Sequence, residues 1–461
     1  MSKQKAVVMG FGKSGKAVLD FFIEQNSNKN LYIYNDTPIT DLESQKKYEA
    51  QGVTFLVGQD QFQQLEDADL IIVSPGINGR APRFAPLRAR KIKIVSEIEL
   101  AFAFFEAKII AVTGTNGKST TVSLIHHILK TAGKDSFLTG NIGTPIISQV
   151  AGISGDSIVV VELSSFQLEE IIHFRPDIAL ILNITPDHLD RYANTEEYFA
   201  AKLNVVRNQV EEDYLILNAD DPVLQQDKNK ERYGRARTLW FSLHEDKPAC
   251  AAWIAGGHIF LQLAPAGPPE KISLARNPLR GMHNLENILA AVIAVRLAGV
   301  LPADIEAGIA SFIGLTHRME SAGKIHNVEF INDSKATNVD ATLKSITGID
   351  EAMVLILGGK DKGGDFTALE DPIRKRVQHV LLVGQASDTI RRQLKNVADK
   401  LINVTDFSDA VAQGLKLLEN TGGVVLLAPA CASFDMFNNF EHRGEVFKEE
   451  VAKLKRKIEN G

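Results

Sequence analysis

The 461-residue sequence predicts an α/β protein of three domains, each built around a largely parallel sheet. Apolar runs of strand length alternate with segments of helical periodicity almost throughout the chain. Two of these runs lead directly into glycine-containing turns that open helices, as is typical of nucleotide-binding sheets. The length fits three units of about 150 residues. We predict domains at 1–96, 97–314 and 315–461.

The composition narrows the class of protein. Hydrophobic residues make up 44% of the chain and charged residues 23%, which is ordinary for a globular protein. The net charge of −6 argues against nucleic-acid binding, and no apolar stretch approaches the ~20 residues of a membrane span. Only Cys250 and Cys431 occur, and Met1–Lys5 is followed by no signal-peptide core. We therefore expect a cytoplasmic protein with no disulfide framework, no nucleic-acid partner and no membrane insertion.

The first domain carries a glycine turn directly after its first strand. The segment Gly10–Gly15 matches G-x-G-x-x-G, and Asp36 closes the next strand about twenty residues later. Any diphosphate can sit on such a turn, so three interpretations stay open: a nicotinamide dinucleotide, another nucleotide diphosphate, or a purely structural turn. The loop Ser74–Ile77 follows a further strand and is either a ligand-binding loop or a plain turn.

The second domain begins with a phosphate-binding loop, Gly114–Thr120, between the apolar run Lys108–Val112 and a helix-like segment. Glycines at 114 and 117 let the backbone N–H groups turn inward, and Lys118 can reach a β- or γ-phosphate. The hydroxyl of Ser119 or Thr120 can bind Mg²⁺. Val112 stands where the strict pattern has glycine, so the loop is a shortened form. We predict that the protein uses ATP.

Three further residues of this domain are candidates for the same site. Glu162 follows a strand, where a carboxylate suits Mg²⁺, His188 lies in a loop after another strand, and Lys202 lies in a helix-like segment. Each also has a plainer interpretation: a cap or ion pair for Glu162, a loop hydrogen bond for His188, and a solvated surface position for Lys202. The spacings fit no zinc site.

The third domain places polar clusters after three of its strands, at the edge where parallel sheets bind ligands. Arg318 would suit a γ-phosphate, because it can stabilise the charge that shifts in phosphoryl transfer. Lys335 and Lys362 would suit a substrate that carries carboxylates. Cys431 is expected to be packed rather than nucleophilic, since no paired histidine is evident in the sequence.

Several segments together resemble the Mur ligases, the ATP-dependent enzymes that build the peptide of the peptidoglycan precursor. The shortened phosphate loop is shared with sister ligases and folylpolyglutamate synthase. Two segments, within Ile331–Asn338 and at Pro429–Ser433, are more particular to the member that adds D-glutamate. The matching segments, in the order of the family, are Glu162–Gln167, Asp187–Arg191, Gly281–Asn287, His317–Glu320, Ile331–Asn338, Pro429–Ser433 and Asn439–Gly444.

The resemblance implies an activity, its substrates and its cofactors. The fold would consist of a Rossmann-like N-terminal domain, a central P-loop ATPase-type domain and a Rossmann-like C-terminal domain. The reaction would be ATP-dependent ligation of D-glutamate to UDP-N-acetylmuramoyl-L-alanine through an acyl phosphate, in peptidoglycan synthesis. Mg²⁺ would assist ATP, and the protein would act as a monomer.

The resemblance also assigns site residues. The catalytic residues would be Lys118, His188, Lys202 and Arg318. The ATP site would contain Gly114, Thr115, Asn116, Gly117, Lys118, Ser119, Thr120, Asn287, Arg318 and Asp333. The UDP-substrate site would contain Gly12, Lys13, Ser14, Gly15, Asp36, Thr37, Ser74, Pro75, Gly76, Asn141 and His188. D-Glutamate would contact Lys335, Thr337, Lys362, Ser433 and Phe440. The metal ligands would be Ser119, Glu162, His188 and Lys202, the lysine after carbamylation.

Three rival functions remain at this point. A sister amide ligase or a folylpolyglutamate synthase would differ in the amino acid that it selects. A nicotinamide-binding oxidoreductase or redox regulator would use the Gly10–Gly15 turn and leave the Gly114–Thr120 loop unexplained. A non-catalytic nucleotide-binding regulator would bind ATP without substrate-dependent phosphate release.

Overall fold

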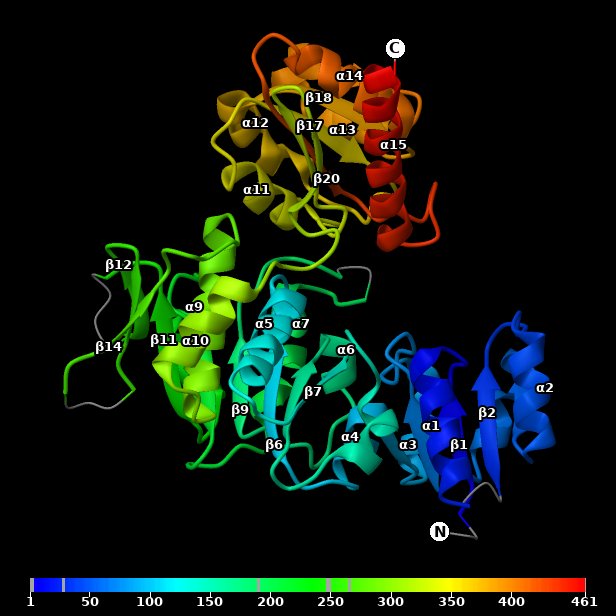
Figure 1. Cartoon of the computed structure of the whole chain (residues 1–461). Helices are drawn as coiled ribbons and strands as arrows, with labels where there is room; N and C mark the ends of the chain where they lie inside the picture. The colour runs from blue at the N-terminus through cyan, green and yellow to red at the C-terminus, as the bar shows by residue number, and fades with distance from the viewer. Residues whose placement is uncertain (1–3, 27–29, 189–190, 246–249, 264–266, 461) are drawn as a thin grey trace. The chain divides into compact units, whose positions relative to one another are not determined.

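The computed structural model describes residues 4–26, 30–188, 191–245, 250–263 and 267–460. Within these residues the strands form three sheets of five, nine and six strands, accompanied by helices (Figure 1). The sheets are wholly or mostly parallel, which confirms the predicted α/β class. The chain divides into two compact units: unit 1 holds the first two sheets, and unit 2 holds the third sheet with residues 185–195 and 276–286.

The first sheet has the strand order of a nucleotide-binding fold, with every neighbouring pair parallel. Its strands, in spatial order, are β3 (Thr54–Val57), β2 (Leu31–Asn35), β1 (Ala6–Met9), β4 (Leu70–Val73) and β5 (Lys93–Ser96). Its helices are α1 (Lys13–Glu24), α2 (Leu42–Ala50) and α3 (Ala85–Ala89). Since β2, β1 and β4 are adjacent and parallel, the loops that follow them share one edge of the sheet.

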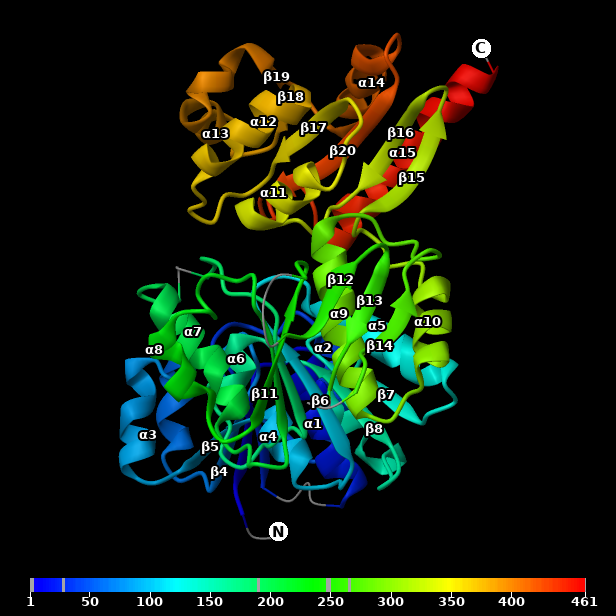
Figure 2. The same ribbon diagram turned by 90° about the vertical axis from the view of Figure 1, so that its left-hand side faces the viewer.

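The second sheet is parallel from β7 to β12 and is continued by two antiparallel strands, β13 and β14 (Figure 2). Its strands, in spatial order, are β14 (Glu270–Ser273), β13 (His258–Leu261), β12 (Cys250–Ala255), β11 (Arg237–Ser242), β10 (Tyr214–Asn218), β9 (Ile178–Ile181), β6 (Lys108–Thr113), β8 (Ile158–Glu162) and β7 (Ser136–Gly140). Its helices are α4 (Glu97–Phe102), α5 (Lys118–Thr131), α6 (Ser165–Leu168), α7 (Thr195–Leu203), α8 (Asp227–Lys230), α9 (Met282–Leu297) and α10 (Pro302–Ser311). The phosphate loop therefore follows β6, between β8 and β9.

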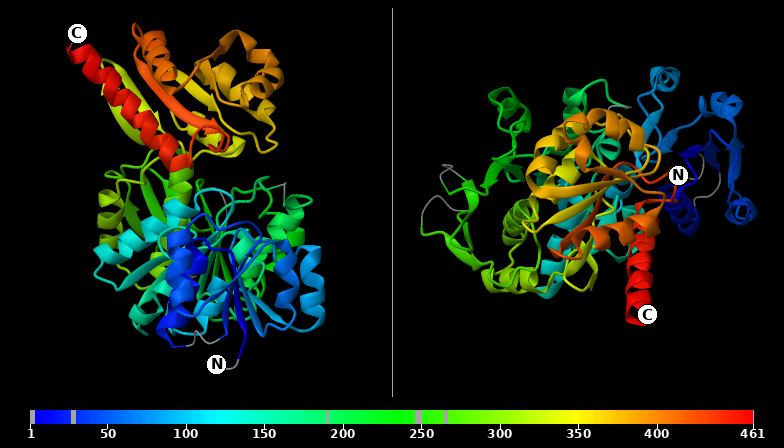
Figure 3. Two further views of the ribbon diagram at one scale, coloured as in Figure 1. Left: turned by 90° about the vertical axis from the view of Figure 1, so that its right-hand side faces the viewer. Right: turned by 90° about the horizontal axis from the view of Figure 1, so that it is seen from above.

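The third sheet places β16, β20 and β17 side by side and parallel. Its strands, in spatial order, are β15 (Glu320–Ile325), β16 (Val328–Asn332), β20 (Gly423–Ala430), β17 (Met353–Gly358), β18 (Val377–Val383) and β19 (Leu401–Asn403). Its helices are α11 (Val339–Thr347), α12 (Glu370–Arg376), α13 (Ser387–Gln393), α14 (Phe407–Leu418) and α15 (Phe440–Asn460). Helix α15 packs along β15 and β16 (Figure 3, left). The polar loops after β16, β20 and β17 thus meet at one edge, as the sequence predicted.

Helix starts near the site are set by local capping. The Ser96 hydroxyl accepts from the backbone N–H of Glu99 at the start of α4, and Ser164 forms a capping box with Gln167 at α6. The Asn338 side chain accepts from the N–H of Ala341 and starts α11. Such caps end the preceding loops at defined points, because they satisfy N–H groups that have no partner inside the helix.

Among the described helices, none combines the length and the apolar character that crossing a bilayer requires. The first sheet ends at Ser96, α10 ends at Ser311 and β15 begins at Glu320. The domain limits at 96 and 314 stay predictions beside these observed ends.

Candidate active site

The glycine turn of the first sheet borders an open cavity of about 570 Å³. The predicted residues Gly12, Lys13, Ser14, Thr37, Ser74, Pro75 and Gly76 all line this cavity. Gly15 lies behind the turn, where a side chain would not fit: an added Cβ would stand 1.9 Å from the carbonyl oxygen of Gly10. The turn therefore depends on close backbone packing, which is the role of the third glycine in such motifs.

Asp36 is held by neighbours and is not among the residues that line the cavity. Arg83 donates from Nη1 to Oδ1 at 2.6 Å and from Nη2 to Oδ2 at 2.9 Å, and the Tyr34 hydroxyl donates to Oδ1 at 2.7 Å. The hydrogen bond from Arg83 is the main reason that the pKa of Asp36 lies below its usual range. The carboxylate that a dinucleotide-binding domain offers to a ribose is thus engaged inside the protein. No sequence motif pointed to Arg83.

Lys13 connects the glycine turn to the segment that follows β7 of the second sheet. The Lys13 ammonium donates to the carbonyl oxygen of Gly143, in the segment that follows β7. In the same segment, Asn141 Nδ2 donates to Glu162 Oε1 at 2.8 Å. Asn141, predicted to contact the UDP-substrate, is therefore bonded to the predicted metal ligand and lies two residues before the acceptor of Lys13.

The phosphate loop has the backbone that its glycines predicted. Gly114 and Gly117 have φ angles of +141° and +87°, which glycine adopts most readily. Lys118 Nζ folds back and donates to the carbonyl oxygens of Gly114, at 2.9 Å, and Thr115, at 2.7 Å. The loop is also fastened by Asn183, which sequence reasoning did not single out.

Asn183 clamps the loop from the end of β9. Its carbonyl oxygen accepts from the N–H of Thr115 at 2.9 Å, and its Oδ1 accepts from the N–H of Asn116 at 2.8 Å. Its Nδ2 donates to the carbonyl oxygen of Asn116 at 3.0 Å. One signal in the sequence could have identified this residue: Asn183, like Glu162, directly follows an apolar run of strand length.

Lys202 is buried and reaches the same loop. Its side chain is 1% exposed, and its Nζ donates to the carbonyl oxygen of Gly114 at 2.8 Å. The ammonium also lies 4.3 Å from the ring centroid of Tyr198. The interpretation of Lys202 as a solvated surface lysine is wrong. Helix α7 instead directs it to the carbonyl that Lys118 also contacts.

Glu162, Ser119 and Thr120 offer the oxygen ligands that Mg²⁺ prefers. Glu162 pairs with Val112 across β8 and β6 and is 1% exposed, while Ser119 and Thr120 are buried in the first turn of α5. Glu162 Oε2 and Thr120 Oγ1 are buried without a hydrogen-bond partner in the part of the chain that is described. Two unsatisfied buried oxygens beside a phosphate loop fit a cation. No cluster of three His, Cys, Asp or Glu side chains suited to a metal occurs among the described residues.

Asn287 lies against the start of α5. It is 3% exposed, and its Oδ1 accepts from Thr121 Oγ1 at 3.3 Å. A Cβ added at Gly117 would come within 2.2 Å of that oxygen. The structure therefore brings this predicted ATP-site residue to the phosphate loop.

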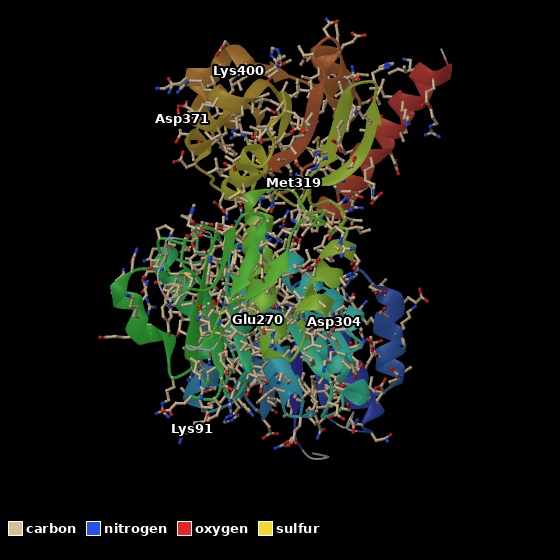
Figure 4. The ribbon with its side chains drawn as sticks, turned by 60° about the vertical axis from the view of Figure 1, so that its left-hand side comes forward. Lys91, Glu270, Asp304, Met319, Asp371 and Lys400 are labelled. Carbon is tan, nitrogen blue, oxygen red and sulfur yellow. The ribbon has the colours of Figure 1, made fainter. Side chains whose placement is uncertain are left out.

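In unit 2, Arg318 lies between two strained residues. His317 and Met319 have φ angles of +60° and +48°, which are unfavourable for residues with a Cβ. Asp333 supports this loop: its Oδ1 accepts from the N–H of Met319 at 3.3 Å, and its Oδ2 accepts from the Ser345 hydroxyl. Burial raises the pKa of Asp333. Figure 4 labels Met319, which lies at the opposite end of unit 2 from Lys400.

Arg318 also lines a cavity of about 300 Å³ in unit 2. The other residues that line this cavity include Leu279, Asn284 and Thr316. The side chain that was predicted to meet ATP phosphates is thus accessible from a concave surface.

Of the predicted D-glutamate residues, Lys335 and Thr337 follow β16, Ser433 follows β20, and Phe440 begins α15. Lys335 Nζ lies 3.8 Å from the ring centroid of Phe440, and the N–H of Thr337 donates to the carbonyl oxygen of Lys335 at 2.8 Å. Ser433 is buried in the loop after β20. Cys431 is fully buried, which confirms that it is packed, and burial raises the pKa of its thiol to about 12.

Arg443 joins these two loops, and sequence reasoning missed it. Its Nη2 donates to the carbonyl oxygen of Ser334 at 2.8 Å, and its Nη1 donates to that of Cys431 at 3.1 Å. The side chain is 1% exposed, and burial lowers its pKa to about 10. An arginine at the start of a charged helix such as α15 gives no local sign that it is buried.

Lys362 pairs with Asp187, which lies next to His188. The Lys362 ammonium is 3.6 Å from Asp187 Oδ1, and Asn338 Nδ2 donates to Asp187 Oδ2 at 3.2 Å. Burial alone would raise the pKa of Asp187, but Lys362, His188 and the hydrogen bonds hold it below its usual range. The His188 ring is half-buried, with Nε2 3.9 Å from Asp187 Oδ2. Leu189 and Asp190 lie outside the described residues.

Models of three families match the chain in series. A Mur ligase MurD-like N-terminal domain matches residues 4–96, a Mur ligase middle domain matches 112–295, and a Mur ligase glutamate ligase domain matches 317–431. These matches follow the three sheets in order.

Similar proteins extend over nearly the full length. UDP-N-acetylmuramoylalanine--D-glutamate ligase of Koribacter versatilis is 40% identical over 460 residues, covering 98% of each chain. The protein of the same name from Acidobacterium capsulatum is 40% identical over 450 residues, covering 97% of this chain and 96% of its own.

Solved structures share the fold. UDP-N-acetylmuramate-alanine ligase MurC from Thermotoga maritima aligns with a TM-score of 0.59 and 18% identity, over 98% of this chain and 100% of its own. MurF ligase from Thermotoga maritima in complex with ADP aligns with a TM-score of 0.58 and 18% identity, over 98% and 96%. At such identities the likeness concerns the fold alone. With three family models in series and 40% identity over almost the whole length, the chain belongs to the Mur ligase family.

Proposed function

We propose that this protein ligates D-glutamate to UDP-N-acetylmuramoyl-L-alanine with ATP, in peptidoglycan precursor synthesis. The observation that carries the proposal is the arrangement at the phosphate loop. Lys118 and Lys202 both donate to the carbonyl oxygen of Gly114, which directly follows β6. The neighbouring strand β8 ends in Glu162, whose Oε2 is buried without a hydrogen-bond partner among the described residues. The names of the full-length relatives support the choice of substrates.

The chemistry requires activation of a carboxylate, because a carboxylate has no leaving group that an amine could displace. Transfer of the γ-phosphoryl group from ATP to the L-alanyl carboxylate forms an acyl phosphate and ADP. The amine of D-glutamate then attacks the acyl carbon and loses a proton, and the tetrahedral intermediate expels phosphate to leave an amide. Positioning of the reactants supplies much of the acceleration.

The nucleotide site would use the loop at 114–120 together with Asn287, Arg318 and Asp333. The loop N–H groups and Lys118 would bind the phosphates, and Arg318 would stabilise the charge that shifts during transfer. Asn287 would hold the loop at Gly117, and Asp333 would hold the backbone beside Arg318. Bound Mg²⁺, held by Ser119 or Thr120 and Glu162, would offset the charge of the phosphates.

We further propose that Lys202 is carbamylated. Its amine, after losing a proton, would add to CO₂ and release a second proton, so that a cation becomes a carboxylate-like ligand. Two ammonium groups on one buried carbonyl repel each other, and carbamylation removes one of these charges. His188 would be a further ligand and a contact of the UDP-substrate.

The two remaining substrates would occupy the sites described above. The cavity at Gly12–Gly15, Thr37 and Ser74–Gly76 would take the UDP portion, with Asp36 shaping the loop from behind. Lys335, Thr337, Lys362, Ser433 and Phe440 would surround D-glutamate, and the two lysines would face its carboxylates. We place the reaction in the cytoplasm and expect a monomer, which light scattering after gel filtration can test.

Phosphate release from ATP and Mg²⁺ with UDP-N-acetylmuramoyl-L-alanine, across a panel of D- and L-amino acids, tests the proposal. We expect release with D-glutamate alone and a ligated product in the mass spectrum. Release with another amino acid would indicate a sister activity. No release with any of them would favour a nucleotide-binding regulator, and NADH fluorescence on titration would favour an oxidoreductase. A Lys118→Met variant controls for contaminating ATPases.

A further inference from the structure

Helix α4 carries two buried carboxylates that take no part in the proposed chemistry. Glu97 is 4% exposed and Glu99 is 5% exposed, and both lie in the first turn of α4, which directly follows β5 of the first sheet. Buried acidic side chains are costly unless they are satisfied. Each of them is satisfied by backbone N–H groups of the second domain, but in different segments.

Glu97 holds the short helical turn at Ile146–Ser148. Its Oε1 accepts from the backbone N–H of Ile147 at 2.8 Å, inside the apolar core that contains Ile98 and Ile146. This turn packs against both α1 and α4, and therefore against the helix that opens at the glycine turn.

The residues just before that turn connect the first and second domains, which both belong to unit 1. Gly143 accepts from the Lys13 ammonium through its carbonyl oxygen, and Asn141 donates to Glu162 Oε1 at 2.8 Å. The segment is tightly built: the N–H of Gly140 donates to the carbonyl oxygen of Thr144 at 3.0 Å. We call residues 141–148 the connecting segment. It is fastened at one end to Glu162 and at the other to Glu97.

We infer that Glu97 is a positioning residue: through the connecting segment it sets the places of Asn141 and Gly143 between the UDP-substrate cavity and Glu162. The inference rests on the proposed function, since it assigns to Glu97 an effect on binding of the UDP-substrate. It is a role at a distance, because Glu97 is not among the residues that line the cavity.

Glu99 is a matched control on the same helix. Its carboxylate accepts from the backbone N–H groups of Ile172, His173 and Phe174 at 2.8–3.0 Å. These residues follow α6 and lie outside the connecting segment. Replacing Glu99 therefore removes an equally buried anchor without touching the segment that carries Asn141 and Gly143.

Hydrogen exchange of the free protein at pH 8 tests the anchoring, with Glu97→Gln and Glu99→Gln compared. The glutamine amide keeps the size of the side chain but presents N–H donors where the carboxylate only accepted. We expect exchange in the connecting segment to quicken about tenfold in E97Q and to stay near wild type in E99Q. Exchange at residues 172–174 should instead quicken in E99Q and stay near wild type in E97Q. Equal acceleration of both segments in both variants would overturn the inference.

Calorimetric titration with UDP-N-acetylmuramoyl-L-alanine tests the consequence for binding. We expect its Kd, and its KM in the ligase assay, to rise about five- to tenfold in E97Q, with the KM for ATP within about twofold of wild type. E99Q should leave both substrates unaffected even if its melting temperature falls. An E97Q variant that binds the UDP-substrate like E99Q would refute the positioning role. A wild-type protein that binds this substrate but forms no amide would refute the proposed ligation instead.

Discussion

Glu97 also has a consequence for stability. Burial raises the pKa of its carboxyl from the ordinary 4.5 to about 7. The folded protein therefore binds this proton more tightly than the unfolded chain does, so the contribution is present below pH 4.5 and is lost as the pH rises to about 7. At about 1.4 kcal/mol per pKa unit, the loss is about 3 kcal/mol.

We predict that urea unfolding at pH 5 and pH 8 shows this loss in the wild type and a smaller one in Glu97→Gln. Glutamine cannot titrate, so its stability should vary less between these two values. The comparison isolates Glu97 because the other titrating groups are the same in both proteins. A variant with the full wild-type difference between pH 5 and pH 8 would contradict the assignment.

Lys202 shows that the sequence around a lysine does not reveal whether its side chain is solvated or buried. A lysine in a helix with acidic neighbours is typical of a solvated surface, yet Lys202 donates to Gly114, 88 positions earlier in the chain. We predict that Lys202→Met, which keeps most of the buried volume, lowers kcat about 10²- to 10³-fold and leaves the fold intact. Steady-state kinetics with a circular dichroism spectrum would show this.

The state of Lys202 can be examined separately. If the amine is carbamylated, activity should fall when CO₂ is stripped from the buffer and recover when bicarbonate is added. Lys202→Met should show no response to bicarbonate. Full activity of the wild type in CO₂-free buffer would argue against carbamylation but not against the role of the lysine in the loop.

Helix α5 depends on a glycine before its first residue. Gly117 precedes the helix at φ +87°, and a Cβ there would also press on Asn287 Oδ1. Gly133 follows the same helix at φ +70° with no heavy atom within 4 Å of a built Cβ. A residue with a Cβ would be strained by the backbone conformation at both positions. Only at Gly117 would that Cβ also clash with a neighbouring atom.

We predict that Gly133→Ala costs about 1 kcal/mol of stability, from strain alone. Gly117→Ala should cost about 1–3 kcal/mol more, because Asn287 or the loop must move, and it should weaken ATP binding. Urea denaturation and nucleotide titration would separate the two variants. Equal losses in both would mean that the contact with Asn287 is readily relieved.

Strand order explains why polar clusters that are far apart in the chain lie at one edge of the third sheet. The clusters after β16, β20 and β17 are far apart in the chain, but these strands are adjacent and parallel. Alternation of strands and helices predicted the shared edge, since parallel strands end on the same side. The contact of Lys362 with Asp187 could not be predicted in this way. It joins the third sheet to a loop that follows β9 of the second.

The molecule as a whole consists of two compact units, and the phosphate loop with Glu162 and Lys202 belongs to unit 1. A ligand that binds only the folded state stabilises it by an amount set by its concentration and Kd, about 2.7 kcal/mol at a hundredfold excess over Kd. We predict that calorimetry shows two unfolding transitions, one for each unit. MgATP should raise the melting temperature of the unit 1 transition by several degrees. Adding EDTA should abolish most of the shift, and Glu162→Gln should do the same without EDTA. A shift that is insensitive to both would contradict the metal assignment.

Features that depend on neighbours along the chain were predictable. Hydrophobic periodicity predicted the strands, helices and three sheets, and the two glycine turns predicted their own backbone, because each of these is governed by local sterics and hydrogen bonding. The residues of the site were assigned largely through the resemblance of their segments to the family, and their roles stay predictions.

Features that depend on contacts between distant segments needed the folded chain. Arg83 meets Asp36 across 47 positions, Arg443 meets Ser334 across 109, and Glu97 meets Ile147 across 50. A charged side chain has the same local pattern whether it is solvated or buried. Its environment is set by which strands become neighbours and which loops then meet, and that is a property of the packed molecule.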